Sequence, residues 1–262
     1  MIGQFFAEAS LFVGGLVLIA AMVGAREIGA YARRVANRRH KSAPTTENDA
    51  NVLLSVALGL LSLLLGFAFS IALSRYDDRR ELVASEASAI ATASQRIGLL
   101  DNPARDELMR EIRQYTAVRV SAGMAVNEKR RRSLDRRSDK LSIRLVKSTV
   151  KAALPLRGTS TATVVLDGVD RALDLADRRR ATAEAKLPSI VVGTLVTYCV
   201  VVAGLFGYAL TSTASRNRIV SYLLFALFAS VVSMILDLDR PRGGAITVGQ
   251  EPMKAVYQKL VS

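Results

Sequence analysis

The chain carries few side chains of the types that perform covalent or metal chemistry. It has one histidine, His40, and one cysteine, Cys199, among 262 residues. One of each cannot complete a zinc site, and a single cysteine cannot form a disulfide within the chain. The glycine-rich phosphate loops and the G-x-S-x-G turn of hydrolases do not occur in the sequence. We therefore expect no enzymatic activity, no cofactor and no metal ion.

A pair of carboxylates near the C-terminus, Asp237 and Asp239, is the clearest polar candidate site. They follow directly on an apolar segment, so they would lie at its boundary. One interpretation pairs them with nearby arginines, namely Arg240, Arg75 or Arg79. The other is a calcium site, but calcium takes about six to eight oxygen ligands and only two carboxylates are available locally. We therefore favour ion pairs.

Four uncharged apolar segments indicate the elements that must position these side chains. They comprise residues 11–25, 52–73, 187–210 and 219–236. A helix needs about 20 apolar residues to cross a bilayer, and these runs approach or exceed that length. Helices buried in the core of a soluble protein are the alternative, and four such runs in one chain argue against it. Residues 1–10 contain no Lys or Arg, so the first run does not read as a cleaved signal peptide.

Between the second and third apolar segments lies a charged insert, residues 74–186, with 24 basic and 16 acidic residues. Its apolar residues recur at helical spacing, so the second span should continue to about residue 99. A new helix should start at Pro103, with Leu108, Ile112 and Tyr115 on its inner face. Residues 128–140 should form a solvated turn or helix end, and residues 141–154 a short helix. A last long helix should follow residues 158–161 and continue into the third span.

These features together predict an all-α integral membrane protein. Its four transmembrane helices would form two hairpins, with a helical extramembrane insert between spans two and three. The expected boundaries are an N-terminal hairpin (1–73), the basic helical insert (74–186), a C-terminal hairpin (187–236) and a C-terminal segment (237–262). We therefore expect the lipid bilayer to be one partner of the protein.

Small residues form a stripe on one face of the second span, at steps of three and four. The stripe consists of Ser55, Gly59, Ser62, Gly66 and Ser70. Small residues let helices approach closely in lipid, so the first interpretation is a packing face, which we assign to Ser55, Ser62 and Gly66. The second interpretation is the lining of a pathway along a symmetry axis. The candidates for that lining are Gly59, Leu63, Phe67 and Ser70.

Two motifs at the ends of spans two and four resemble the bestrophin superfamily, in particular its bacterial bestrophin-like branch. The first contains Gly66-Phe67, Ser70, Arg75-Tyr76, Asp78, Arg80 and Leu82. The second contains Leu236-Asp237-Leu238-Asp239-Arg240-Pro241, Gly243-Gly244 and Gln250-Glu251-Pro252. The layout of two spans, a helical insert and two spans is also similar. Within these motifs we take Arg75, Tyr76, Asp78, Arg80, Asp237, Asp239 and Arg240 as polar residues at the membrane boundary.

The resemblance implies an oligomeric channel for small anions, a homo-pentamer in bestrophins, with the second span around the axis. Phe67 and Leu63 would then belong to a hydrophobic neck, with Gly59 one helical turn before Leu63 in the sequence. Three positions differ from the family pattern. Gly59 replaces a bulky aliphatic residue, Ala68 replaces an arginine and Arg242 replaces a phenylalanine.

The chain has an excess of basic residues, with a formal net charge of +13. This excess bears on membrane orientation and on the type of partner the protein binds. Lys and Arg near the span ends, with the resemblance, favour a multi-pass protein of the cell membrane whose insert and both termini are cytoplasmic. Basic and acidic residues are interspersed in the insert, and residues 129–132 lack neighbouring aromatic side chains, so we expect no nucleic acid. The alternative function is a non-conducting scaffold or sensor whose insert binds a partner or anionic lipid.

Overall fold

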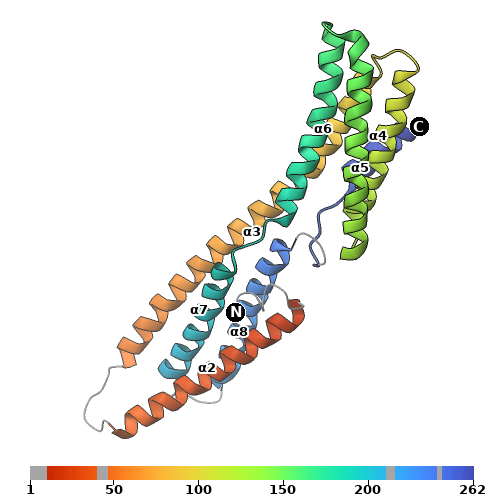
Figure 1. The fold of residues 1–262 in the computed structure, drawn as a ribbon. Coiled ribbons are helices and arrows are strands. Elements are labelled where there is room, and N and C mark those ends of the chain that lie inside the picture. The colour runs from red at the N-terminus through yellow and green to blue at the C-terminus, as the bar shows by residue number, and fades with distance from the viewer. Residues whose placement is uncertain (1–10, 40–46, 211–215, 241–243) are drawn as a thin grey trace. The chain divides into compact units, whose positions relative to one another are not determined.

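A computed structural model describes residues 11–39, 47–210, 216–240 and 244–262, and the regular structure in these ranges is entirely helical. This confirms the all-α prediction for the described residues. His40 and Arg242 lie outside them. The elements, shown in Figure 1, are α2 (Leu11–Arg39), α3 (Glu47–Ile97), α4 (Ala104–Met124), α5 (Glu128–Ala153), the 3₁₀ turn η1 (Leu154–Leu156), α6 (Ser160–Glu184), α7 (Ser189–Ala209), α8 (Arg216–Asp239) and α9 (Glu251–Val261).

The chain divides into two compact units. In described residues, the first, called the apolar unit, comprises 11–39, 47–75, 186–210, 216–240 and 244–246. The second, called the charged unit, comprises 76–185 and 247–262. Helix α3 contributes its first part to the apolar unit and its second part to the charged unit. Four helical stretches are long and apolar enough to cross a membrane, and their apolar parts correspond to the four segments read from the sequence.

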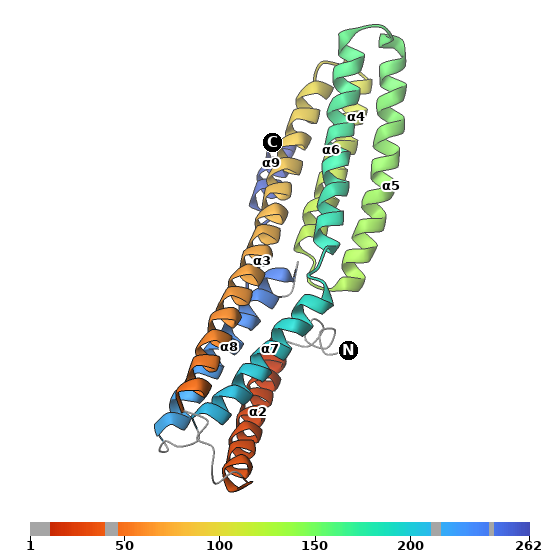
Figure 2. The ribbon, with the colours of Figure 1, turned by 90° about the vertical axis from the view of Figure 1, so that its left-hand side faces the viewer.

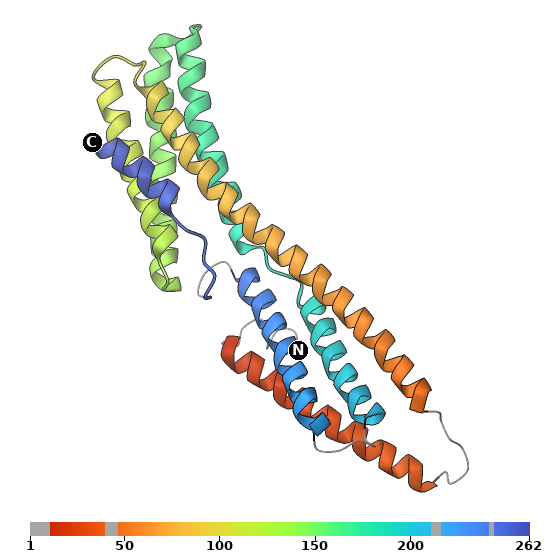
Figure 3. The same ribbon diagram turned by 180° about the vertical axis from the view of Figure 1, so that it is seen from behind.

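In the apolar unit, α2 packs against both α7 and α8 (Figure 3). Two glycine contacts bring the backbones of α2 and α7 together. A Cβ atom on Gly29 would overlap the carbonyl oxygen of Gly204, and one on Gly207 would overlap the carbonyl oxygen of Arg26. Small residues therefore do set helix packing in this unit, as is usual in lipid, but on α2 and α7 rather than along the predicted stripe.

Helix α2 continues beyond residue 25, where the uncharged run ends. Arg26 is buried, and its guanidinium donates to Glu27 at 2.5 Å and lies 5.6 Å from the ring centre of Tyr222. Two turns further on, Arg33 donates to the carbonyl oxygens of Tyr208 and Ala209 at 3.0 and 3.2 Å. These carbonyls end α7, where the helix dipole favours a cation. Both arginines thus have partners within the apolar unit, and the helix extends past its apolar part.

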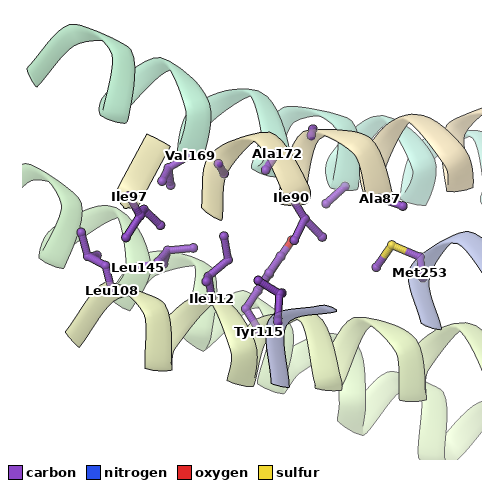
Figure 4. Packing of buried hydrophobic residues seen from close by; sticks show 14 of the residues in the cluster. Ala87, Ile90, Ile97, Leu108, Ile112, Tyr115, Leu145, Val169, Ala172 and Met253 are labelled. Atoms are coloured by element: carbon purple, nitrogen blue, oxygen red, sulfur yellow. The ribbon is translucent and has the colours of Figure 1, made fainter. Parts of the chain in front are cut away.

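The charged unit is a helical bundle with one hydrophobic core, built by the second part of α3 with α4, α5, α6 and α9 (Figures 2 and 4). Ile90, Ile112, Tyr115 and Leu145 are almost completely buried in it. Figure 4 shows these side chains directed toward one another, with Met253 of α9 at the edge of the group. The inner face predicted for α4, with Leu108, Ile112 and Tyr115, is part of this core.

Residues 128–140 are helical, which corrects the expected turn. The side chain of Asn127 caps α5 by accepting hydrogen bonds from two backbone amides of the first turn at 2.9 and 3.2 Å. Within the helix Arg132 donates to Glu128 at 2.6 Å and Arg131 donates to Asp135 at 3.3 Å. A capping asparagine and pairs four residues apart stabilise a helix without burial. The high charge density of this stretch therefore indicated exposure and not a loop.

Two other boundaries differ from expectation. Helix α6 ends at Glu184, and Pro188, in an extended conformation, precedes α7, so the predicted continuous helix is interrupted. Proline disfavours helical geometry in the residue before it, which explains the break. Helix α9 was not predicted. Its eleven residues contribute buried Met253 and Leu260 to the charged unit.

Candidate functional site

The first part of α3 has one face packed in the apolar unit and an opposite face that the other described residues leave exposed. The packed face carries Leu54, Leu61, Leu65, Ala68 and Ala72, all buried. On the opposite face Leu63 is 54% and Phe67 60% exposed, and Gly59 and Ser70 are exposed as well. The four pore-lining candidates therefore share one outward face, and none of them belongs to the protomer core.

The packing stripe also lies outside the protomer core. Ser55, Ser62 and Gly66 are exposed, and a Cβ atom on Gly66 or on Gly59 would meet no atom within 4 Å. The serine hydroxyls donate to carbonyl oxygens one turn earlier in their own helix, both at 2.9 Å. The stripe is thus smooth and internally hydrogen-bonded. No described part of the chain approaches the stripe closely at Gly59 or Gly66.

Around the helix axis, the outward face divides into two flanks of different size. Since successive residues are about 100° apart around an α-helix, Ser55, Ser62 and Gly66 fall on one flank. Exposed bulky residues fall on the other flank, namely Leu53, Leu60, Leu64 and Ile71. Gly59, Leu63, Phe67 and Ser70 lie between the flanks. The helix therefore presents a flat side and a protruding side.

Ala68, where the family resemblance places an arginine, is 5% exposed on the packed face. An arginine in this position would point into the apolar unit rather than along the outward face. The difference from the family pattern at this residue therefore leaves the charge of the outward face unchanged.

The two aspartates at the end of α8 accept hydrogen bonds from backbone amides. Asp237 accepts hydrogen bonds from the backbone amides of Ala245 and Ile246 at 3.1 and 3.0 Å. A Cβ atom on Gly244 would overlap the Asp237 carboxylate, so glycine is needed there for the chain to approach. A carboxylate accepting two amides is a strong anchor. Asp237 thereby fixes the segment that follows α8.

Asp239 accepts a hydrogen bond from the backbone amide of Leu187 with each carboxylate oxygen at 2.9 Å, and Arg75 Nη1 lies 3.9 Å from its Oδ1. Arg79, the other arginine of α3 considered for this pairing, donates to the carbonyl oxygen of Ala185 at 3.2 Å. In the described ranges no three residues of the metal-binding types cluster. Asp239 therefore ties the start of the third apolar segment to the end of the fourth.

The remaining boundary residues are not brought together. Asp78 and Arg80 are exposed on α3, and Tyr76 is half-buried. The backbone amide of Arg240 donates to the carbonyl oxygen of Asp237 at 3.1 Å. These residues follow the family motif in sequence but make no common site.

A buried ionic network in the charged unit was missed from the sequence. The Glu86 carboxylate, completely buried, accepts hydrogen bonds from Arg119 Nε at 2.6 Å and Nη2 at 3.0 Å, and from Arg179 Nη1 at 2.7 Å. Arg179 Nη2 also donates to Gln250 Oε1 at 2.5 Å, and Gln250 in turn donates to the carbonyl oxygen of Val248 at 3.1 Å. The network joins α3, α4, α6 and the segment before α9.

Electrostatics keeps this network ionised. Burial by itself would raise the pKa of Glu86, but the hydrogen bonds and charges of Arg119 and Arg179 outweigh it and hold the pKa below the ordinary 4.5. Arg119 is buried too, and its hydrogen bond to Glu86 more than offsets the burial and raises its pKa. Next to this network, burial raises the pKa of Tyr115 to about 12. The sequence signal was Arg119, which continues the helical spacing of Leu108, Ile112 and Tyr115 on the predicted inner face of α4.

The described residues form an all-helical protein with four helices long and apolar enough to cross a membrane, a charged helical bundle and an exposed outward face on α3. The family model of the Bestrophin-like domain matches residues 19–253. The chain therefore belongs to the bestrophin-like family. A search of curated proteins found no match.

Solved structures of a bacterial bestrophin homologue from Klebsiella pneumoniae share the fold. A variant with a tryptophan replaced by alanine gives a TM-score of 0.72 at 14% identity, covering 97% of this chain and 98% of that chain. A variant with a tyrosine replaced by alanine gives 0.70 at 14% identity, covering 94% and 97%. The structure phased with zinc gives 0.68 at 14% identity, covering 93% and 97%.

Proposed function

We propose that this protein assembles from identical subunits in a membrane and conducts small anions along an axis lined by the outward face of α3. The four apolar helices would cross the bilayer as two hairpins, with residues 74–186 and both termini in the cytoplasm of the cell. Membership of the bestrophin-like family supports this proposal. The observation that carries it is the exposure of Leu63 and Phe67 on a helix whose other face is fully packed.

The two flanks of α3 are suited to a ring of identical subunits. In a cyclic assembly each subunit presents one flank to the neighbour on one side and the other flank to the neighbour on the other side. The flat flank of Ser55, Ser62 and Gly66 can receive the protruding flank around Leu60 and Leu64, since small residues permit close approach in lipid. Head-to-tail contact of this kind leaves Gly59, Leu63, Phe67 and Ser70 facing the axis.

The choice of anions rests on family membership and on the overall charge. The chain has a formal net charge of +13, and an excess of basic residues raises the local concentration of anions. Residues 75–81, which follow the apolar part of α3, add no net charge because three arginines and three carboxylates are interspersed there. Apolar rings of Leu63 and Phe67 would hold the path closed by dewetting.

Assembly can be tested with Gly66→Leu, matched by Gly24→Leu on α2. At both positions a Cβ atom meets nothing within 4 Å in the protomer, so neither leucine strains the fold of one subunit. We expect native mass spectrometry in detergent to show a ring for the parent and for Gly24→Leu, and smaller species for Gly66→Leu. A monomeric parent, or a Gly66→Leu ring as stable as the parent, would contradict the assembly.

Conduction can be tested by replacing both Leu63 and Phe67 with alanine. Since the two side chains are exposed in the protomer, the melting temperature should change little, while a wider and wetted neck should raise chloride efflux from liposomes several-fold. The matched control replaces exposed Ile28 and Tyr31 of α2 with alanine. Unchanged flux in the double neck variant would leave the non-conducting scaffold as the better description, and a reversal potential that follows sodium would refute anion selectivity.

A further inference from the structure

A cavity of about 300 Å³ lies within the charged unit, away from the outward face of α3. Its walls come from α3, the end of α4 and the loop that follows, the last turns of α6, and the segment leading into α9. Gly123 of α4 forms part of the wall, and a Cβ atom there would overlap the side chain of Gln250. The shape of the wall thus depends on a glycine at this position.

Three basic side chains line the cavity, Arg79, Arg179 and Lys254, and the described lining residues include no carboxylate. The guanidinium of Arg179 is fixed by Glu86 and Gln250, and that of Arg79 donates to the carbonyl oxygen of Ala185. Lys254 pairs with Glu251 at 2.9 Å on the exposed side of α9. Fixed guanidinium groups are the ones best suited to bind a phosphate with directed hydrogen bonds.

Helix α9 starts beside the cavity. Gln250 at its N-terminus provides no side-chain cap, so the N-terminal end of the helix adds positive potential to that of the three basic side chains.

The rest of the lining is apolar. Val83 and Val248 form part of the wall, and Met124 and Val126 lie at the same cavity with 50% and 87% of their surface exposed. Large apolar side chains exposed beside a cationic pocket favour a ligand that has an organic body as well as a charge. A simple inorganic ion would leave these side chains in water.

We propose that this cavity binds a phosphate ester, with the phosphate held by Arg79, Arg179 and Lys254 and the organic part against Met124 and Val126. The ester can be the head group of an anionic lipid or a small soluble metabolite. Arg79 follows Leu73, the last residue of the apolar run, by six residues, which is about 9 Å along a helix and within reach of lipid phosphates. The proposal is independent of conduction.

The experiment measures binding to the purified full chain in detergent by native mass spectrometry. The probes are dioctanoyl phosphatidic acid, glycerol 3-phosphate, inorganic phosphate and, without phosphate, dioctanoyl glycerol. Lys254→Gln is compared with Lys259→Gln, an exposed lysine of the same helix, and Arg79→Gln with Arg80→Gln. Lys254 is partly exposed and pairs only with Glu251 at the surface, so its variant should fold even if the Arg79 variant does not.

We expect saturable binding of at least one phosphate ester, weakened about fivefold by Lys254→Gln and unchanged by Lys259→Gln, since one charge-assisted contact is lost. Binding of phosphatidic acid alone would identify a lipid head group, and equal binding of glycerol 3-phosphate a soluble ester. Three results would overturn the proposal: no ester binding above dioctanoyl glycerol, inorganic phosphate binding as tightly as the esters, or equal losses in the two lysine variants.

Discussion

Replacement of Glu86 by glutamine should destabilise the charged unit strongly. The carboxylate accepts three hydrogen bonds of 2.6 to 3.0 Å from two arginines whose side chains are each only 7% exposed. Glutamine keeps the shape but offers one acceptor and no charge, so two guanidinium groups remain buried without a counter-charge. Breaking a buried ion pair by removing one partner costs about 3–5 kcal/mol, and we expect about 3 kcal/mol here because the amide oxygen keeps one bond.

Far-UV circular dichroism of the full chain in detergent measures the effect, since the sequence has no tryptophan for fluorescence. A loss of about 3 kcal/mol corresponds to a melting temperature lower by about 6–12 °C in a chain of this size. Glu81→Gln, an exposed carboxylate on the same helix, should change it by less than about 2 °C. Hydrogen exchange should quicken in the second part of α3, α4 and α6 and stay unchanged in α2 and α7.

The pH dependence supplies an independent check. Because the folded pKa of Glu86 lies below 4.5, its contribution to stability is complete above that pH and is lost as the pH falls through the folded value. The parent should therefore lose stability in acid more steeply than Glu86→Gln. If Glu86→Gln melts within 2 °C of Glu81→Gln and shows the same acid profile, the network does not hold the bundle together.

Three further predictions concern single contacts. Gly29→Ala should lower the melting temperature markedly, because its Cβ would overlap the carbonyl of Gly204, whereas Gly24→Ala should not, and equal melting would contradict the close α2–α7 packing. Asp237→Asn should cost about 1–3 kcal/mol and speed hydrogen exchange at residues 245–246, since an amide accepts less well than a carboxylate. Tyr115→Phe should remove one tyrosine titrating near pH 12, and between pH 10 and 12 the parent alone should lose the stability linked to that raised pKa.

The helical fold could be predicted from the sequence because the signals for helices are local in the chain. Uncharged runs of about 20 residues can satisfy a bilayer only as helices, and the spacing of Leu108, Ile112 and Tyr115 defines an inner face whatever packs against it. The family motifs around Gly66 and Asp237 identified the bestrophin-like family for the same reason. The four pore-lining candidates fell on one face because helical periodicity alone determines it.

Contacts between distant segments were decided only by the tertiary structure. No local pattern relates Glu86 to Arg179 or Asp237 to the amide of Ala245, because such pairs depend on which helices become neighbours. The small-residue stripe shows the same limit. Its spacing predicted a packing face, yet the glycines that pack within the protomer are Gly29 and Gly207, since close approach needs a matching partner helix and a sequence names only one side of the contact.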